Sequence, residues 1–170
     1  MGQVTAGFGA VLYDPRDQAV EFVEGPIPKL YMDKWTDSGK RQVVGQAEVL
    51  PVLLARTTWK ARLEERTILL FIDNASARFA VMKGYSPVLD TAEMLYHIWR
   101  HEVEDASTTW CARVPSPSNL ADGTSKMQDF LLLRLGARRI VAVFPSFGLC
   151  GETGGNACTN LPVTVGAGKC

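Results

Sequence analysis

Three acidic residues stand at the ends or starts of expected elements, where their side chains could converge. Glu48 falls early in an expected helix, Asp73 directly follows an apolar strand, and Asp122 opens a later helix. Carboxylates brought together without a cation repel one another, so such a cluster implies a hard metal ion or a raised pKa. Two Mg²⁺ ions roughly 4 Å apart would use these oxygens, one activating a water and the other stabilising the leaving 3′ oxygen of a phosphodiester. The acids therefore predict a magnesium-dependent site that cuts nucleic acid.

The competing interpretation is that each acid is an ordinary exposed residue or a helix cap. For Asp122 alone that interpretation is the better one, because aspartate near a helix start is common. Asp73 is harder to dismiss, since a charge at the end of a core strand is costly unless it has a partner. Spacing alone leaves the two interpretations evenly matched.

The first third of the chain predicts a β-hairpin, a loop and a helix. Residues 8–13 and 19–23 are short β-prone runs separated by a turn in which Pro15 suits the second position. Residues 25–41 are rich in charge and turn formers and predict a loop. Apolar residues recur at helical spacing over residues 44–62, and Pro51 there requires a late start or a kink.

The middle of the chain alternates strands and helices. Thr67 to Ile72 is a continuous apolar run, which predicts a central strand buried on both faces. A short helix over residues 75–83 should end at Gly84. A long amphipathic helix is expected from a Ser86 cap to about Val103. Its predicted apolar stripe consists of Leu89, Ala92, Leu95, Tyr96 and Trp99.

A second strand over residues 108–114 completes the pattern, and Asn119 to Asp122 opens another helical piece. This order predicts an α/β fold, a mixed sheet with helices packed over it. We expect one domain over residues 1–130 and a C-terminal extension over residues 131–170, the last part of it poorly ordered because it is rich in glycine and polar residues.

Composition limits the kinds of partner. The formal net charge is zero, so the chain lacks the strong basic excess of a nucleic-acid coat protein, and any contact with nucleic acid must be local. Residues that could touch phosphates are Arg138, Arg139 and the group Lys60, Arg62 and Arg66. The four cysteines form no close CxxC pair, no secretory signal is evident and no apolar run is long enough to span a bilayer. We therefore expect an intracellular protein of the cytoplasm or nucleus, not secreted and not in a membrane.

Four motifs in order carry a resemblance to a known family. They are VGQAEVL at residues 44–50, FIDNASA at 71–77, KGYS at 83–86 and RVPSPSNLADGTSK at 113–126. Together they resemble the ribonuclease H-like domain of reverse-transcribing retroelements, over roughly residues 6–126.

The resemblance implies helices on both faces of the sheet and an activity that hydrolyses the RNA strand of RNA/DNA hybrids with two Mg²⁺ ions, for which Mn²⁺ could substitute. It implies that Glu48, Asp73 and Asp122 are the catalytic residues and metal ligands. It further implies a reverse transcriptase domain as a companion in a parent polyprotein. The polar residues of the same motifs, expected to orient the acids or the substrate, are Asn74, Asn119 and Ser125.

The chain also departs from the family pattern. The family's first acid lies on a central strand just before a GxGAVL strand, and here GFGAVL at residues 7–12 is preceded only by residues 1–6. The N-terminal strand and its aspartate are therefore expected to be missing. Asp14 and Asp17 cannot replace that acid, because they fall in the hairpin turn at the far end of the next strand. Lys126 stands where the family usually has arginine.

The missing acid leaves two further hypotheses open. Loss of one carboxylate from a two-metal site should cost orders of magnitude in rate, so this chain could be inactive as it stands. It would then be a degenerate remnant that binds nucleic acid at most. Integrase-type strand transfer is a third possibility, but that relative carries its last glutamate on a late helix and not in an NxAD motif.

Overall fold

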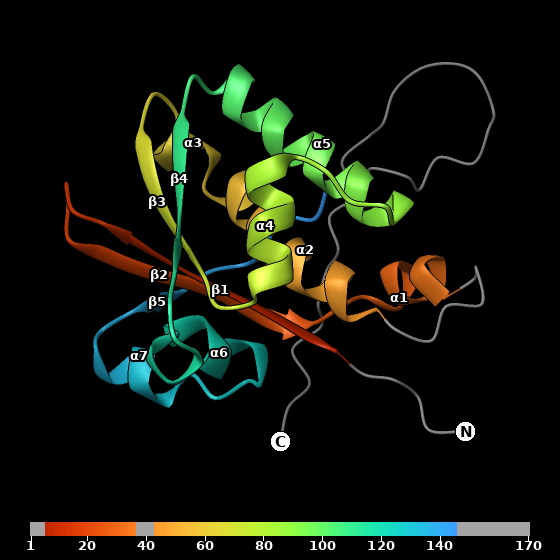
Figure 1. Ribbon diagram of the computed structural model, residues 1–170. Coiled ribbons are helices and arrows are strands. Elements are labelled where there is room, and N and C mark those ends of the chain that lie inside the picture. The colour runs from red at the N-terminus through yellow and green to blue at the C-terminus, as the bar shows by residue number, and fades with distance from the viewer. Residues whose placement is uncertain (1–5, 37–42, 146–170) are drawn as a thin grey trace, which may run out of the picture.

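The computed structural model describes residues 6–36 and 43–145, which form a mixed α/β protein (Figure 1). The strands are β1 Gly7–Asp14, β2 Ala19–Pro26, β3 Thr67–Ile72, β4 Thr108–Arg113 and the short β5 Arg138–Arg139. The helices are α1 Lys29–Thr36, α2 Val44–Thr58, α3 Lys60–Leu63, α4 Ala75–Lys83, α5 Leu89–Glu104, α6 Leu120–Ser125 and α7 Phe130–Arg134, with one 3₁₀ turn at Ser116–Ser118.

The predicted hairpin is confirmed, and each of its faces packs against different helices. β1 and β2 pair antiparallel from Gly7 opposite Pro26 to Asp14 opposite Ala19. Alternate side chains of a strand point to opposite faces, so Phe8 and Val23 join the main core beneath α2, whereas Phe22 packs with Leu132 of α7. The hairpin therefore has helices on both faces.

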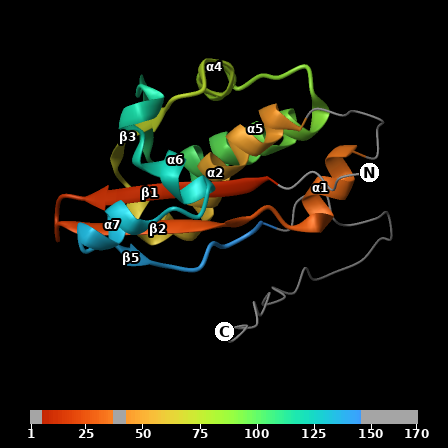
Figure 2. The ribbon, with the colours of Figure 1, turned by 90° about the horizontal axis from the view of Figure 1, so that it is seen from below.

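The expected single mixed sheet is instead two small sheets in the described part of the chain. β1, β2 and β5 form one sheet, with β5 parallel to β2, while β3 and β4 form a separate parallel pair. Figure 2 shows β5 beyond the β2 edge of the hairpin, and β3 with α4 beyond the β1 edge. The expectation of one sheet is wrong because no described strand joins β1 to β3.

Strand β3 is present with the predicted bounds, but it is not buried on both faces. Leu69 and Phe71 are exposed, while Ile68 and Leu70 pack against the main core and Ile72 is buried. Among the described residues β3 pairs with β4 alone, and no helix covers its outer face. A continuous apolar run did predict a strand, but it did not determine how many of its faces are covered.

One apolar core lies beneath both sheets and is centred on α2. Val49, Leu50, Leu53 and Leu54 of this helix are fully buried, and α2 packs on β1, α4 and α5. Pro51 lies inside the helix, which begins at Val44, so the expected late start is wrong. A proline interior to a helix removes one backbone hydrogen bond, and burial of the leucines around it offsets that loss.

Two helices differ from the sequence expectation. Residues 29–36, expected as loop, form α1, which buries Tyr31, Met32 and Trp35. The long helix α5 begins at Leu89, after Ser86 Oγ accepts a hydrogen bond from the Val88 N–H. Its buried side chains are Thr91, Met94, Leu95 and Ile98, so most of the predicted stripe was wrong.

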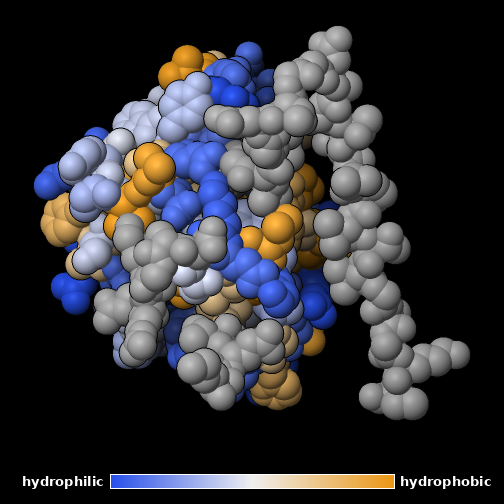
Figure 3. Space-filling model, turned by 90° about the vertical axis from the view of Figure 1, so that its right-hand side faces the viewer, coloured by the Kyte–Doolittle hydropathy of each residue, from blue (hydrophilic) through white to orange (hydrophobic). Residues whose placement is uncertain are grey.

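The short helix α4 confirms its prediction, including Gly84 as a C-terminal cap with φ of 62°. Figure 3 shows the side of the molecule that carries α1, where hydrophobic patches are small and separated by hydrophilic surface. None of the helices in the described ranges is both long enough and apolar enough to cross a lipid bilayer. The predicted disorder of the last residues concerns a segment outside the described ranges.

Candidate functional site

Glu48 lies in the first half of α2, on the rim of the core. Its neighbours Val49 and Leu50 are buried and face the hydrophobic interior, whereas Glu48 is half-buried. The helix thus carries this carboxylate at a half-buried position next to its buried residues. Burial alone would raise the pKa of such a group.

Asp73 and Asn74 connect β3 to α4. The Asn74 Oδ1 atom accepts a hydrogen bond of 3.0 Å from the Ala77 N–H, so Asn74 caps α4. Asp73 precedes that cap and is half-buried. The expected role of Asn74 in orienting substrate stays a prediction, since the structure assigns its side-chain oxygen to the helix cap.

Asp122 and its neighbours form α6, which is built much like the Asn74 turn. Asn119 Oδ1 accepts a hydrogen bond of 3.1 Å from the Ala121 N–H and caps the helix, and Ser125 Oγ donates one of 2.9 Å to the Asp122 carbonyl. The Asp122 carboxylate itself accepts a 2.7 Å hydrogen bond from Lys126 Nζ. This ion pair was not predicted, although the spacing of four residues on a helix was its signal.

Glu48 of α2 feels the charges of Asp73, which follows β3, and of Asp122 in α6. Burial, and then the negative charges of Asp73 and Asp122, raise the pKa of Glu48. The helix α6 packs directly on β1, as Figure 1 shows. The charges of both aspartates therefore act on Glu48, while the assignment of the three acids to one catalytic site stays a prediction.

The chemistry of the donors fits Mg²⁺, but their arrangement is incomplete for a metal centre. Carboxylate oxygens are the ligands that Mg²⁺ prefers. Within residues 6–36 and 43–145, however, no group of three or more His, Cys, Asp or Glu side chains is arranged to hold a metal ion. Lys126 also supplies positive charge to Asp122. The site as described is a loose cluster of three acids.

Comparison with protein-family models, with curated proteins and with solved structures finds no significant match. The ribonuclease H-like resemblance thus depends on the sequence motifs alone.

All five basic residues expected to touch phosphates have acidic partners in the structure, and their contact with phosphate stays a prediction. Lys60 contacts Asp105, Arg62 contacts Asp14, Asp17 and Glu21, and Arg66 lies 3.7 Å from Asp14. The remaining two pairs are Arg138 with Glu21 and Arg139 with Glu24. These cations balance buried carboxylates of the hairpin and of α5, so their charge is already neutralised within the fold.

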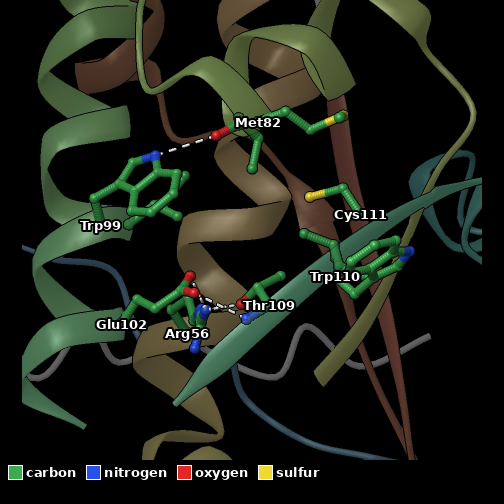
Figure 4. A pocket seen from close by; sticks show the side chains of 10 residues that line it. Arg56, Met82, Trp99, Glu102, Thr109, Trp110 and Cys111 are labelled. Atoms are coloured by element: carbon green, nitrogen blue, oxygen red, sulfur yellow. Dashed lines mark hydrogen bonds and ion pairs between the residues drawn. The ribbon is translucent and has the colours of Figure 1, made fainter. Parts of the chain in front are cut away.

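A separate cavity of about 230 Å³ lies between α4, α5 and β4 (Figure 4). Its walls are mostly apolar, and at one end the buried Arg56 donates hydrogen bonds to Glu102 and Thr109. Figure 4 shows Met82 and Cys111 on the opposite side from that cluster. None of the three acids lines this cavity. Arg56 and Glu48 are eight residues apart on α2, roughly 12 Å at the rise of an α-helix.

Proposed function

We propose that this chain is a ribonuclease H-like domain of retroelement origin, whose complete form hydrolyses the RNA strand of RNA/DNA hybrids. The observation that supports it is the gathering of Glu48, Asp73 and Asp122 from three separate elements. Each acid sits in one of the four motifs, and the motifs follow the order of the family.

In this proposal the three carboxylates hold Mg²⁺, which supplies a nucleophilic water and neutralises developing charge on the phosphate when bound. Burial and the two aspartates raise the pKa of Glu48, and a bound cation would offset the repulsion between these negative charges. Lys126 competes with the metal for Asp122. Asn74 and Asn119 hold the turns that carry the two aspartates in place.

The proposed site would take a fourth acid, carried by a strand that pairs with the free edges of β1 and β3. β1 and β3 each have one edge without a described strand partner. An additional strand between them would satisfy backbone groups on both edges and would carry its own acid close to Asp73. We propose that the family's first strand and its aspartate occupy this position.

The test is magnesium-dependent cleavage of a labelled RNA/DNA hybrid by the protein extended, ahead of residue 1, with a strand that ends in the family's aspartate. We expect the extended protein to cut the RNA strand and Asp73→Asn to lower the rate by at least about a hundredfold. Asp33→Asn is the matched control, because Asp33 is an exposed residue of α1 paired with Lys29. If the extended protein cuts nothing, or if Asp73→Asn cuts as well as Asp33→Asn, the proposal fails.

The second candidate is a non-catalytic remnant with at most nucleic-acid binding. It is favoured by the division of the sheet and by the pairing of Asp122 with Lys126. A magnesium titration of the melting temperature separates the two, because a ligand that binds only the folded state raises it. A remnant should show no rise beyond that produced by an equal ionic strength of sodium chloride.

A further inference from the structure

The basic side chains of the described part divide into paired and unpaired sets. Most lie within 4.0 Å of a carboxylate, as already given for the hairpin and α5. Those with no ion pair among the described residues are Arg78, Lys83, Arg113 and Arg134. An unpaired cation keeps its full charge for an external anion, so the unpaired set marks where a polyanion would be attracted.

Two of these cations share one exposed aromatic ring on α4. The Arg78 guanidinium carbon lies 5.3 Å, and Lys83 Nζ 5.9 Å, from the centroid of the Phe79 ring. This ring is 50% exposed, so about half of its surface is open to solvent. Cations beside an exposed ring combine phosphate attraction with a platform on which a base can stack.

Arg113 lies close to the same surface. It ends β4 on the side of the sheet that faces α4, two residues after Cys111, and the charge of Arg78 acts on the Cys111 thiol. α4 and β4 are in direct contact. Arg78 and Arg113 therefore belong to one surface, contributed by a helix and by the end of a strand.

This surface adjoins the candidate acid site. Arg113 is the register partner of Ile72, the residue before Asp73, and α4 begins just after Asp73. The helix is nine residues long, about 12 Å from its first to its last residue, which spans roughly three nucleotides of a strand. A chain of phosphates following α4 would arrive at Asp73.

We infer that Arg78, Lys83 and Arg113, with Phe79, form a binding surface for the phosphodiester backbone of a nucleic-acid strand that leads to Asp73. The inference rests on the proposed function in one respect: the nucleic-acid strand bound on this surface is taken to be the one hydrolysed at Glu48, Asp73 and Asp122. Positive charge at this place offsets the repulsion between the acids and the phosphates. Phe79 stacks on a base without selecting its identity.

The test is fluorescence anisotropy of a labelled RNA/DNA hybrid with the full chain, in EDTA so that no cleavage occurs. The affinity is measured from about 50 to about 200 mM salt. The slope of log affinity against log salt is negative. Arg78→Gln and Arg113→Gln should each reduce its magnitude by roughly 0.7 to 0.9, because each removes one phosphate contact. Phe79→Leu should weaken binding severalfold and leave the slope unchanged.

The chain offers a matched control in Arg134. It is also unpaired and lies 5.5 Å from the ring of exposed Phe130, but it belongs to α7, across the hairpin from α4 in Figure 1. Arg134→Gln should keep the wild-type slope, and thermal unfolding should show all four variants to be folded. Equal slopes for Arg78→Gln, Arg113→Gln and Arg134→Gln, or no binding by the wild-type chain, would overturn the inference.

The outcome also separates the binding surface from the catalytic proposal. If the salt dependence of Arg78→Gln and Arg113→Gln becomes shallower as expected but the upstream-extended protein cuts no hybrid, the binding surface is supported and the hydrolase proposal fails. If the extended protein cuts the hybrid while the slopes do not change, the hydrolase proposal stands and the substrate follows another path.

Discussion

Gly9 of β1 lies directly against Thr124 of α6, so closely that a β-carbon at Gly9 would be 2.0 Å from Thr124 Oγ1 and 2.5 Å from the Ser125 backbone nitrogen. Thr124 is fully buried, and its hydroxyl donates a hydrogen bond of 2.8 Å to the Ala121 carbonyl. Only glycine allows this approach, which seats the helix carrying Asp122 on the hairpin.

Gly9→Ala should therefore destabilise the fold and shift α6. Overpacking against backbone atoms costs about 1–3 kcal/mol, because a fixed main chain cannot move aside as a flexible side chain can. The measurement is the midpoint of urea unfolding. Gly45→Ala is the control, since a β-carbon there meets nothing within 4 Å and the helix α2 should gain up to about 1 kcal/mol. A midpoint for Gly9→Ala at or above the wild-type value would contradict the contact.

Glu48 should reduce the stability of the metal-free protein at neutral pH. Burial and the charges of Asp73 and Asp122 raise its pKa above the ordinary 4.5, so the folded state binds the proton more tightly than the unfolded state. The stability that this provides is complete below about pH 4.5 and is lost as the pH rises through the folded-state pKa. Glu48→Gln keeps the shape of the side chain and removes the charge.

Thermal unfolding in EDTA should accordingly give Glu48→Gln a higher melting temperature than wild type at about pH 7, and no advantage at about pH 4. Each kcal/mol corresponds to about 2–4 °C for a chain of this size. Glu64→Gln, at an exposed position, is the control. A melting temperature equal to or below that of wild type at neutral pH would show that the three acids do not interact.

How far the fold follows from the sequence depends on whether the signal is local. The cap at Gly84 and the β-hairpin itself come from neighbouring residues, and both were predicted correctly. Helix α1 was missed because Pro26 and Pro28 suggested a loop, although Tyr31 and Trp35 stand one helical turn apart. The helical spacing of apolar residues predicted the wrong core-facing side of α5. Thr91 is buried, whereas Leu89, which was expected in the core, is exposed.

Long-range features were harder to predict. The exposure of Leu69 and Phe71 depends on which elements pair with β3 and cover it, and no local pattern specifies that. The expectation that Glu48, Asp73 and Asp122 could converge came from their places at the ends or starts of elements. The ion pair between Lys126 and Asp122 and the unpaired Arg78 and Arg113 were not predicted, because a charge count cannot say which charges are already partnered.

The buried ion pair of Arg56 and Glu102 should be far more important than an exposed pair on the same helix. Arg56 is 3% exposed and joins α2 to Glu102, to Ser107 and to Thr109 of β4, while Glu102 also accepts a hydrogen bond from the Thr109 N–H. Removing Glu102 would leave a buried guanidinium without its counter-charge. Such a change typically costs 3–5 kcal/mol, so we expect about 3 kcal/mol for Glu102→Ala.

Glu104→Ala is the matched control on α5. Its partner Arg100 is 3.2 Å away, but both side chains are nearly half exposed, and exposed pairs contribute less than about 1 kcal/mol. The free energies of unfolding in urea provide the measurement. If the two variants lose equal stability, the Arg56 cluster does not hold α2, α5 and β4 together.

The hairpin turn should be the acid-sensitive part of the fold. Asp14 is 4% exposed and accepts hydrogen bonds from Arg16 and Arg62, and these contacts hold its pKa well below the ordinary 3.8. A carboxylate whose pKa is lowered on folding stabilises the protein above its unfolded-state value, and that contribution is lost as the pH falls below about 3.8. Asp14→Asn should lower stability at about pH 7 and flatten the pH dependence below about pH 4. Urea midpoints across this range, compared with Asp33→Asn on the exposed surface of α1, measure the effect, and an unchanged slope for Asp14→Asn would show that the arginines are held by Asp17 and Glu21 alone.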